Sequence, residues 1–515
     1  MVIYQLSFCV NEFAPPLSGV SDGSRQALVL GTAQEMFVAG TWQSSMSGDS
    51  FEAMSPATGE SLGTVPQGDR DDARAAIGAA VDAFGRWSRL TAFERAAKMH
   101  AVAEIIESRR DELARTLTLD QGKPLRAEAY DEVDELIEYW RAAAEDAKRL
   151  GGELPNSFTS GNRVLLTRRA RGVVGIISPW NWPYTMPAEL LAPALAAGNA
   201  VVWTPAPTTS LCAIELARCV ADADLPPGVF NLVTGPGPVV GDEIARNPAV
   251  AGVGFIGSTA TGRHVAAAAA GKALVLEMGG NGPIVVLDDA DLDAAVEATM
   301  LACFLCAGQS CTAGERMLVH RAVRDEFVER LAQRVEREIV LGDPLDPATT
   351  MGPLNNEPVA AKMDGHVADA LERGAGLLTG GARKDGMPTP LYWQPTVLTD
   401  VPAEALVATE ETFGPVAPVV AVDSLEHAIE LTNASPYGLL AAIFTADLAQ
   451  GLEFADAVHT GWVNINESSN YWEAHLPFGG RAGTDSGIGR VGGSHVMQSF
   501  TELQTIVLTP HTRRR

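Results

Sequence analysis

Between residues 172 and 280 short apolar runs alternate with helical segments, and this alternation limits the fold more than any other feature. The runs are rich in Val and Ile, and Gly or Pro bounds each of them: GVVGIISP, NAVVWTPA, VFNLVTG, VAGVGFIG and ALVLEMGG. Stretches with helical character separate them, such as ELLAPALAAG and TSLCAIELARCVADADL. Successive strand–helix–strand units require parallel strands and right-handed crossovers. The sequence therefore predicts an α/β fold with a parallel sheet of the nucleotide-binding type.

Two other regions extend this pattern. From residue 71 to about 150, apolar residues recur at three- and four-residue steps, which predicts three consecutive amphipathic helices. After Glu277 a second α/β series begins with the helix DLDAAVEATMLACFLCAG and the strand RMLVH, and ends near GWVNIN. Residues 1–35 show no sustained period, so we expect a loosely ordered N-terminal extension.

Composition and charge exclude several functions. With 38 Lys and Arg against 64 Asp and Glu, the net charge of −26 argues against binding to nucleic acid or to an anionic membrane. No apolar run approaches the roughly 20 residues of a membrane helix. Six irregularly spaced cysteines suggest free thiols in a reducing compartment, and the N-terminus lacks the basic region of a secretion signal. We therefore expect a cytoplasmic protein.

Three cysteines lie close together, and they differ in context. Structural zinc needs four ligands, and no second CxxC or HxxxH accompanies Cys303 and Cys306, so we expect no metal. Cys303 and Cys306 fall on a predicted helix and are interpreted as core residues. Cys311, in GQSCTAGER, follows the helix between small residues that leave a thiol approachable. On local sequence alone, an inert buried thiol remains the more common interpretation.

Four other motifs carry polar groups at the ends of predicted elements. SPWNWP places Asn181 after a strand, where its amide could stabilise an oxyanion or simply form a turn. FIGSTATG contains Gly257 and Gly262 at the start of a helix, where backbone amides can meet phosphate. LEMGG ends a strand with Glu277, and EETFGP contains Glu411. Each motif taken singly is compatible with an ordinary turn or a solvated surface.

Taken in order, the motifs PWNWP, GSTATG, LEMGG, GQSC, EETFGP and LPFGG resemble the aldehyde dehydrogenase superfamily, over Met36 to about Leu508. The spacing of 34 residues between Glu277 and Cys311 is also typical of that family. The resemblance implies two parallel-sheet α/β domains plus a β-strand oligomerisation arm. Its expected parts are a dinucleotide-binding domain over residues 36–150 and 172–276, a catalytic domain over residues 277–480, and an arm with a C-terminal strand over residues 151–171 and 481–509.

The same resemblance implies a reaction. Cys311 would attack an aldehyde, the Asn181 side chain and the Cys311 backbone amide would stabilise the oxyanion, and Glu277 would activate water to hydrolyse the thioester to a carboxylate. A coenzyme A-acylating enzyme is the alternative, which the water-activating Glu277 disfavours. A non-catalytic structural or binding relative is a second alternative, disfavoured because all three catalytic residues are present.

The resemblance also implies a nicotinamide cofactor, and the motifs supply its expected binding residues: Trp180, Thr204, Gly257, Ser258, Gly262, Glu411 and Phe413. The family usually has a lysine and a glutamate where this chain has Thr204 and Pro207. Because the lysine helps to accept a 2′-phosphate, its loss favours NAD, with NADP as the alternative.

The expected substrate residues, by position, are Trp182, Met186, Glu189, Leu305, Ser310, Thr312, Trp472 and Phe478. Most are large and apolar or aromatic, which suggests an apolar or aromatic aldehyde, whereas Glu189 and His475 could recognise a polar substituent. No cluster of arginines indicates a carboxylate-bearing substrate. The exposed edge of the implied arm predicts a homodimer or homotetramer.

Overall fold

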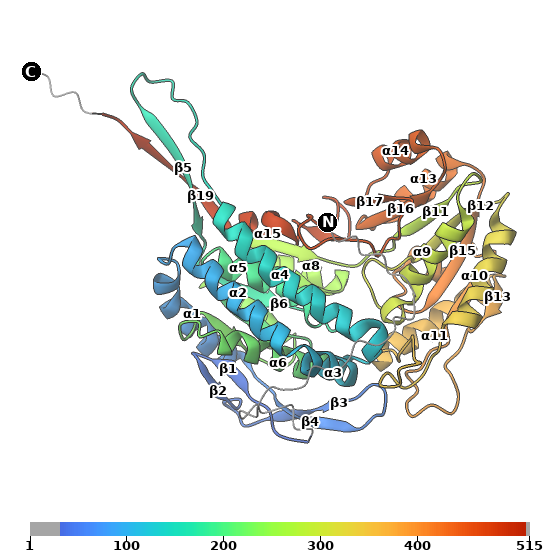
Figure 1. Ribbon diagram of the computed structural model, residues 1–515, viewed down its shortest axis with the longest axis horizontal. Helices are drawn as coiled ribbons and strands as arrows, with labels where there is room; N and C mark the ends of the chain where they lie inside the picture. Colours follow the sequence, from blue (N-terminus) through green and yellow to red (C-terminus); the bar gives the residue numbers. More distant parts are fainter. Residues whose placement is uncertain (1–30, 511–515) are drawn as a thin grey trace, which may run out of the picture.

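The structure is a computed structural model that describes residues 31–510, and it shows two lobes with a narrow projecting arm (Figure 1). Each lobe is built on one mostly parallel sheet. The extension expected over residues 1–35 lies, up to residue 30, outside the described residues. Residues 31–35 are held in place rather than loose, because Gln34 N donates to Thr64 O at 2.8 Å and Ala33 forms a β-bridge with the same residue.

The first sheet is the one that the alternating apolar runs predict. Its strands are β1 Met36–Val38, β2 Thr41–Gln43, β6 Val173–Ile177, β7 Ala200–Thr204, β8 Phe230–Leu232, β9 Val250–Ile256, β10 Ala273–Glu277 and β18 Gly487–Ile488. They follow the order β18-β10-β9-β6-β7-β8-β1-β2, and the strands from β10 to β8 run parallel. Strands β6 and β7 are buried along their whole length, as expected of parallel strands with both faces covered.

Helices cover this sheet: α1 Arg70–Trp87, α2 Ala92–Ser108, α3 Arg110–Gln121, α4 Tyr130–Arg149, α5 Thr185–Ala196, α6 Ser210–Asp222, α7 Val240–Arg246, α8 Thr259–Ala268 and α15 Gly493–Ser499. Leu125–Ala129 forms a π-helical turn before α4, and Pro207–Thr209 a 3₁₀ turn before α6. The prediction of three helices over residues 71–150 is wrong, because the second divides at Arg109. Helices α2 and α3 both bury apolar faces, so the apolar spacing continues across the break and hides it.

The second sheet carries the later α/β series. Its strands are β11 Pro283–Val286, β12 Arg316–His320, β13 Gly376–Thr379, β14 Thr396–Thr399, β15 Val416–Val422, β16 Leu440–Phe444 and β17 Trp462–Ile465. Their order is β13-β14-β15-β12-β11-β16-β17, and all neighbours pair in parallel except β13 with β14. The associated helices are α9 Leu292–Phe304, α10 Arg324–Glu338, α11 Glu357–Glu372, α12 Leu406–Thr409, α13 Leu425–Asn433 and α14 Leu448–Ala457. The change of sheet follows Glu277, where the sequence places it.

Helix α9 is shorter than predicted, and this changes the setting of Cys306. The helix ends at Phe304, and a short 3₁₀ turn, Leu305–Gly308, follows it. Within that turn Cys306 and Ala307 have φ of 53° and 52°, in the left-handed region that ordinary residues rarely adopt. The backbone N–H of Cys306 donates to Glu128 at 3.1 Å, which helps to hold this reversal of the chain. Cys306 is therefore buried as expected, but it does not lie on a helix.

The projecting arm pairs two segments that are distant in sequence (Figure 1). Strand β5 Arg163–Ala170 and strand β19 Thr501–Leu508 form an antiparallel pair over their full length. Within the expected segment 481–509 only residues 501–508 pair with β5, because β18 joins the first sheet and α15 packs on α4 and α5. A separate hairpin, β3 Ser50–Met54 with β4 Ser61–Pro66, lies below the first lobe. Among residues 31–510 no helix is both long and apolar enough to cross a lipid bilayer.

Candidate active site

Neighbouring strands of the first sheet end at a common edge, and the expected site residues follow those ends. Trp180 and Asn181 come after β6, Thr204 ends β7, Gly257 follows β9 and Glu277 ends β10. The four strands are parallel and adjacent in the order β10-β9-β6-β7. Ligands of open α/β sheets bind outside the carboxyl ends of the strands. This edge is therefore a favourable place for a cofactor.

The second sheet contributes loops that precede its strands. Cys311 lies in the loop before β12, and Glu411 lies in the loop before β15. Two hydrogen bonds fix these loops in the site: the Asn181 Nδ2 donates to Gln309 O at 3.0 Å, and the Gly280 N–H donates to Glu411 Oε1 at 2.8 Å. The structure thus brings together motifs that are far apart along the chain.

Cys311 and Glu277 are buried side by side. Their exposed fractions are 7% and 3%, and the two groups are close enough for the carboxyl group to raise the pKa of the thiol. Burial, with the nearby Glu277 carboxyl adding to it, raises the pKa of Cys311 well above its usual value. Burial also raises the pKa of Glu277 to about 8. Its Oε1 has no hydrogen-bond partner within residues 31–510, so one oxygen remains available to a water or a ligand.

Two hydrogen-bond donors lie in the loop region around the thiol. Asn181 is buried, and its amide nitrogen carries two hydrogens, of which Gln309 O accepts one. In the described part of the chain the Cys311 backbone N–H forms no recorded hydrogen bond. Both groups can therefore still donate to an oxygen that develops negative charge.

Four of the expected cofactor residues lie in a ring contact or in close-packed turns. The Trp180 and Phe413 rings meet edge to face with centroids 5.6 Å apart, and Phe413 has φ of 62°. Gly257 has φ of 158°, and a Cβ there would lie 2.8 Å from the Phe255 ring. At Gly262 a Cβ would lie 2.1 Å from the Met278 sulfur, so both positions need glycine.

Two further expected cofactor residues, Ser258 and Thr204, carry hydroxyl groups. The Ser258 hydroxyl caps α8 by accepting from the Thr261 N–H, which directs the helix N-terminus toward the sheet edge. The Thr204 Oγ1 is buried and has no hydrogen-bond partner within residues 31–510. An unpaired buried hydroxyl and close-packed glycines at a strand-to-helix turn fit a bound dinucleotide.

The expected substrate residues lie in three surroundings: a row of aromatic rings, the loop around Cys311, and the turn after α9. Trp182, Trp472 and Phe478 form a chain of rings, with centroids 6.5 Å apart for the first pair and 5.8 Å for the second. Phe478 belongs to the same large apolar cluster as Cys311 and Met186, and Trp182 packs against it. Ser310 and Thr312 instead bond to each other, at 2.7 Å between their hydroxyl oxygens. Leu305 is the first residue of the 3₁₀ turn that follows α9. His475 lies at the surface, 3.3 Å from the Glu473 carboxyl group.

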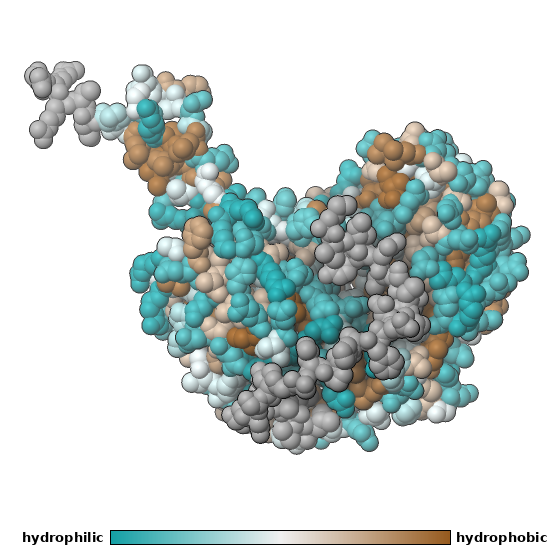
Figure 2. All heavy atoms as spheres, viewed as in Figure 1, coloured by the Kyte–Doolittle hydropathy of each residue, from teal (hydrophilic) through white to brown (hydrophobic). Residues whose placement is uncertain are grey.

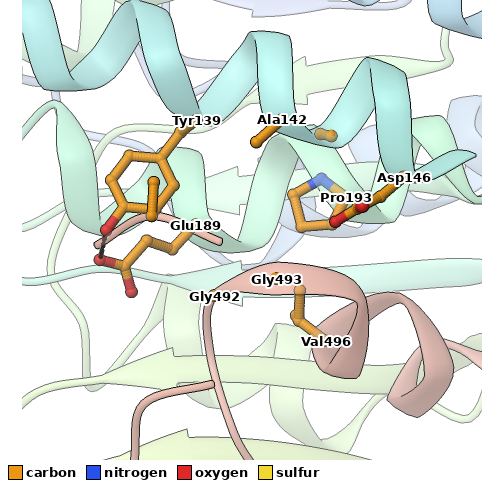
Figure 3. A pocket seen from close by; sticks show the side chains of 10 residues that line it. Tyr139, Ala142, Asp146, Glu189, Pro193, Gly492, Gly493 and Val496 are labelled. Atoms are coloured by element: carbon orange, nitrogen blue, oxygen red, sulfur yellow. Dashed lines mark hydrogen bonds between the residues drawn. The ribbon is translucent and has the colours of Figure 1, made fainter. Parts of the chain in front are cut away.

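Sequence reasoning missed a group of residues on α4. Tyr139 donates to Glu189 Oε1 at 2.8 Å, and the two residues line a pocket between α4, α5 and the start of α15 (Figure 3). Glu135, one helical turn earlier on α4, is also near Glu189. The signal was available, since Glu132 and Tyr139 lie in the buried stripe of an amphipathic helix and Glu135 lies one turn after Glu132, half-buried.

The fold and this cluster define a class: α/β enzymes with a cysteine between two parallel sheets. Comparison with known proteins agrees, because residues 42–506 match the profile described as "Aldehyde dehydrogenase family". The chain belongs to the aldehyde dehydrogenase family. It is an oxidoreductase that converts an aldehyde to the carboxylate with NAD(P), and both its family and its α/β fold are as the motifs indicate.

Individual relatives support this assignment. The chain is 39% identical over 473 residues to the NADP⁺-dependent succinate-semialdehyde dehydrogenase of Escherichia coli K12, covering 92% of this chain and 97% of that protein. It is 37% identical over 477 residues to the 3-sulfolactaldehyde dehydrogenase of Pseudomonas putida, covering 92% and 97%. Among solved structures, betaine aldehyde dehydrogenase from Staphylococcus aureus in complex with NAD⁺ matches with a TM-score of 0.89 and 33% identity, covering 93% of this chain and 96% of that chain.

Proposed function

We propose that Cys311 is the catalytic nucleophile of this aldehyde dehydrogenase. The observation that carries the proposal is the buried Cys311 thiol near the buried Glu277 carboxyl group, in a loop that a hydrogen bond from Asn181 ties to the first sheet. Because the thiol is neutral at rest, its proton must pass to solvent before the sulfur attacks. The sulfur then adds to the aldehyde carbon and forms a thiohemiacetal on Cys311.

Asn181 and the Cys311 backbone amide would hold the oxygen of that intermediate. The Asn181 amide keeps one free hydrogen, and the Cys311 N–H is unused within residues 31–510. Removing one donor of this kind typically costs roughly 100- to 1,000-fold in turnover. NAD(P)⁺, when bound, supplies the acceptor for the hydride that leaves the same carbon. Cys311 is then left as a thioester.

Glu277 would next deprotonate a water that hydrolyses the thioester, which releases the carboxylate and restores the thiol. Its unpartnered Oε1 and its raised pKa of about 8 suit a general base working near neutral pH. A coenzyme A-acylating enzyme has less need of such a base, so we disfavour that alternative. Product analysis with and without coenzyme A tests this choice. Turnover that requires coenzyme A would contradict the role of Glu277.

We propose that the dinucleotide lies along the carboxyl edge of the first sheet. Gly257, Ser258 and Gly262 would receive the pyrophosphate at the start of α8, and Trp180, Glu411 and Phe413 would surround the nicotinamide and its ribose. Thr204 would face the adenosine ribose, and it offers no positive charge to a 2′-phosphate. We therefore infer a preference for NAD, although one relative is named as NADP⁺-dependent. The ratio of kcat/KM for the two cofactors tests this, and a higher value with NADP would contradict it.

Residues 36–150 and 172–276 would form the dinucleotide-binding domain, and residues 277–480 the catalytic domain.

We infer at least a homodimer, because the β5–β19 pair projects from the body and carries exposed apolar side chains (Figure 2). A two-stranded ribbon is marginal on its own and gains stability when packed. We also propose a cytoplasmic location, because all five cysteines of the described chain are unpaired.

A single variant tests the core of this proposal. Cys311→Ala should abolish aldehyde oxidation and any esterase activity, since the sulfur forms the covalent bond in both reactions. Cys303→Ala is the matched control, because its thiol donates to Gly314 O inside the core and faces no site residue. Retention of dehydrogenase activity by Cys311→Ala would refute the nucleophile assignment.

A further inference from the structure

Two loops with different roles in the proposed mechanism touch each other directly. One is the Cys311 loop, residues 305–315, which leads into β12, and the other is the Glu411 loop, residues 410–415, which leads into β15. Strands β12 and β15 are parallel neighbours, so the two loops enter the second sheet at the same edge. At Gly308 a Cβ would lie 2.2 Å from Gly414 O, so the two backbones meet here without room for a side chain.

The side chain of Glu315 joins the same two loops a second time. Glu315 is the last residue of the Cys311 loop, and it is 4% exposed. Its Oε2 accepts the Thr412 N–H at 2.6 Å, and its Oε1 accepts the Phe413 N–H at 2.8 Å. Both carboxyl oxygens of Glu315 are therefore used, each by one backbone N–H of the Glu411 loop.

These two hydrogen bonds hold an unusual backbone conformation. Phe413 has φ of 62°, in the left-handed region that a residue with a bulky side chain enters only at a cost. A conformation of this kind persists where the surrounding groups determine it, and such residues gather at active sites and ligand sites. Among the described residues, the recorded acceptor of the Phe413 N–H is the Glu315 carboxyl group, so Glu315 stabilises this turn directly.

The turn at Phe413 directs two groups of the proposed cofactor site. The Phe413 ring meets the Trp180 ring edge to face, with centroids 5.6 Å apart. Glu411, two residues earlier, reaches the linker after β10, where its Oε1 accepts the Gly280 N–H at 2.8 Å. A change of the backbone at Phe413 would move both side chains, because they lie on adjoining peptide groups. Glu315 thus helps to place groups that its own side chain does not bind.

Other hydrogen bonds of the Glu411 loop hold different atoms. The Asn281 Nδ2 donates to Glu410 O, and the Lys362 Nζ donates to Glu411 O, each at 3.0 Å. Both donors hold carbonyl oxygens at the start of the loop, whereas Glu315 holds the next two N–H groups. Of these hydrogen bonds, those of Glu315 come from the loop that carries Cys311.

From this arrangement we propose that Glu315 is a positioning residue, which fixes the Glu411 loop against the Cys311 loop and so aligns the nicotinamide with the substrate carbon. In this role Glu315 contacts neither cofactor nor substrate, and it acts through Phe413 and Glu411. Hydride transfer depends steeply on geometry, and a misplacement of about 1 Å can cost about 100-fold in rate. The inference rests on the proposed function, because it takes Cys311 as the nucleophile and the Glu411 loop as the site of the nicotinamide ribose.

Equilibrium binding of two ligands tests this role without turnover. NAD⁺ spans the whole proposed site, whereas ADP lacks the nicotinamide and its ribose and so does not reach the Glu411 loop. In Glu315→Gln an NH₂ group replaces one acceptor oxygen and faces a backbone N–H. With the full-length protein, calorimetry should show Kd for NAD⁺ increased by about tenfold and Kd for ADP changed by less than about twofold. A general loss of structure would instead weaken both ligands alike.

Glu128→Gln is the matched control. Glu128 is also 4% exposed, and it also accepts the N–H of a residue with positive φ, Cys306, at 3.1 Å. That contact holds the first turn of the Cys311 loop and does not involve the Glu411 loop. In Glu128→Gln the ratio of Kd for NAD⁺ to Kd for ADP should stay within about twofold of the native value. An equal increase of this ratio in the control, or an unchanged ratio in Glu315→Gln, would overturn the assignment.

The first hydride transfer provides a second readout. Its rate is measured at saturating NAD⁺ by stopped-flow absorbance of the reduced cofactor, so weaker binding does not contribute. In Glu315→Gln this rate should fall by about tenfold or more, because the nicotinamide is less well aligned. An unchanged rate would contradict a role of Glu315 in alignment.

Glu315→Asp keeps the proposal testable if Glu315→Gln does not fold. Aspartate retains both oxygens but is one methylene shorter, so it should raise the same Kd ratio by a smaller factor. An unchanged ratio in this variant would overturn the inference and leave the proposed function intact, since the native enzyme would still oxidise aldehydes. Failure of the native protein to bind NAD⁺ would instead contradict the proposed function itself.

Discussion

At the scale of single residues, the role proposed for Glu277 predicts how the reaction depends on pH. Its pKa is raised to about 8 by burial, so the ionised base becomes more abundant as the pH rises toward that value. We predict that kcat increases from about pH 6 to pH 8 and then levels off. In Glu277→Gln, one burst of reduced cofactor should precede a steady-state rate lowered by about 100-fold or more, as stopped-flow absorbance would show. An unimpaired steady state would mean that another group activates water.

The sequence predicts residues best where a motif fixes them. Asn181 and Glu277 come from short motifs at strand ends, which share one edge of the first sheet because parallel strands end together, and Cys311 comes from a motif in the loop before β12. Glu135 and Tyr139 were missed, since their contacts with Trp472 and Glu189 join separate helices and loops. A charged residue in a helix's buried stripe was the available signal.

At the scale of elements, the arm provides a direct prediction. Leu503, Val507 and Leu508 on β19 are each about half exposed. If a second copy covers this face, replacing Leu503 and Val507 by Asp places charge in an apolar contact and should shift the protein toward monomer. Light scattering after size-exclusion chromatography measures the mass. Leu378→Asp, at a half-exposed site on β13, is the control. An unchanged mass in the double variant would contradict the role of the arm.

Strands were easier to predict than helix ends. Gly and Pro bound the apolar runs, so the strands from β6 to β10 start and end within about three residues of those runs. The break between α2 and α3 was missed, because neither the spacing nor a cap residue marks Arg109, whose side chain forms no capping hydrogen bond. The end of α9 was missed because the apolar residues continue into the turn that carries Cys306.

At the scale of the whole molecule, buried carboxyl groups should make the fold sensitive to alkali. Burial raises the pKa of seven of them to about 7 or 8: Asp120, Glu128, Glu135, Glu189, Glu215, Glu277 and Glu315. The folded state therefore holds protons that the unfolded chain has lost above about pH 4.5. Stability falls as the pH rises from about 5 to 8. We predict that Tm decreases between pH 6 and pH 9 in a calorimetric series. A constant or rising Tm would show that these groups are ionised in the folded protein.

The central claim is that the substrate becomes covalently bound to Cys311 in a site shared by two sheets. The most direct measurement is peptide-mapped mass spectrometry of Glu277→Gln, quenched after mixing with NAD⁺ and an aldehyde that the unmodified enzyme oxidises. In that variant the thioester should accumulate, because the water-activating carboxylate is missing. We expect an acyl adduct on the peptide that contains Cys311. Formation of reduced cofactor without any adduct, or with the adduct on another residue, would contradict it.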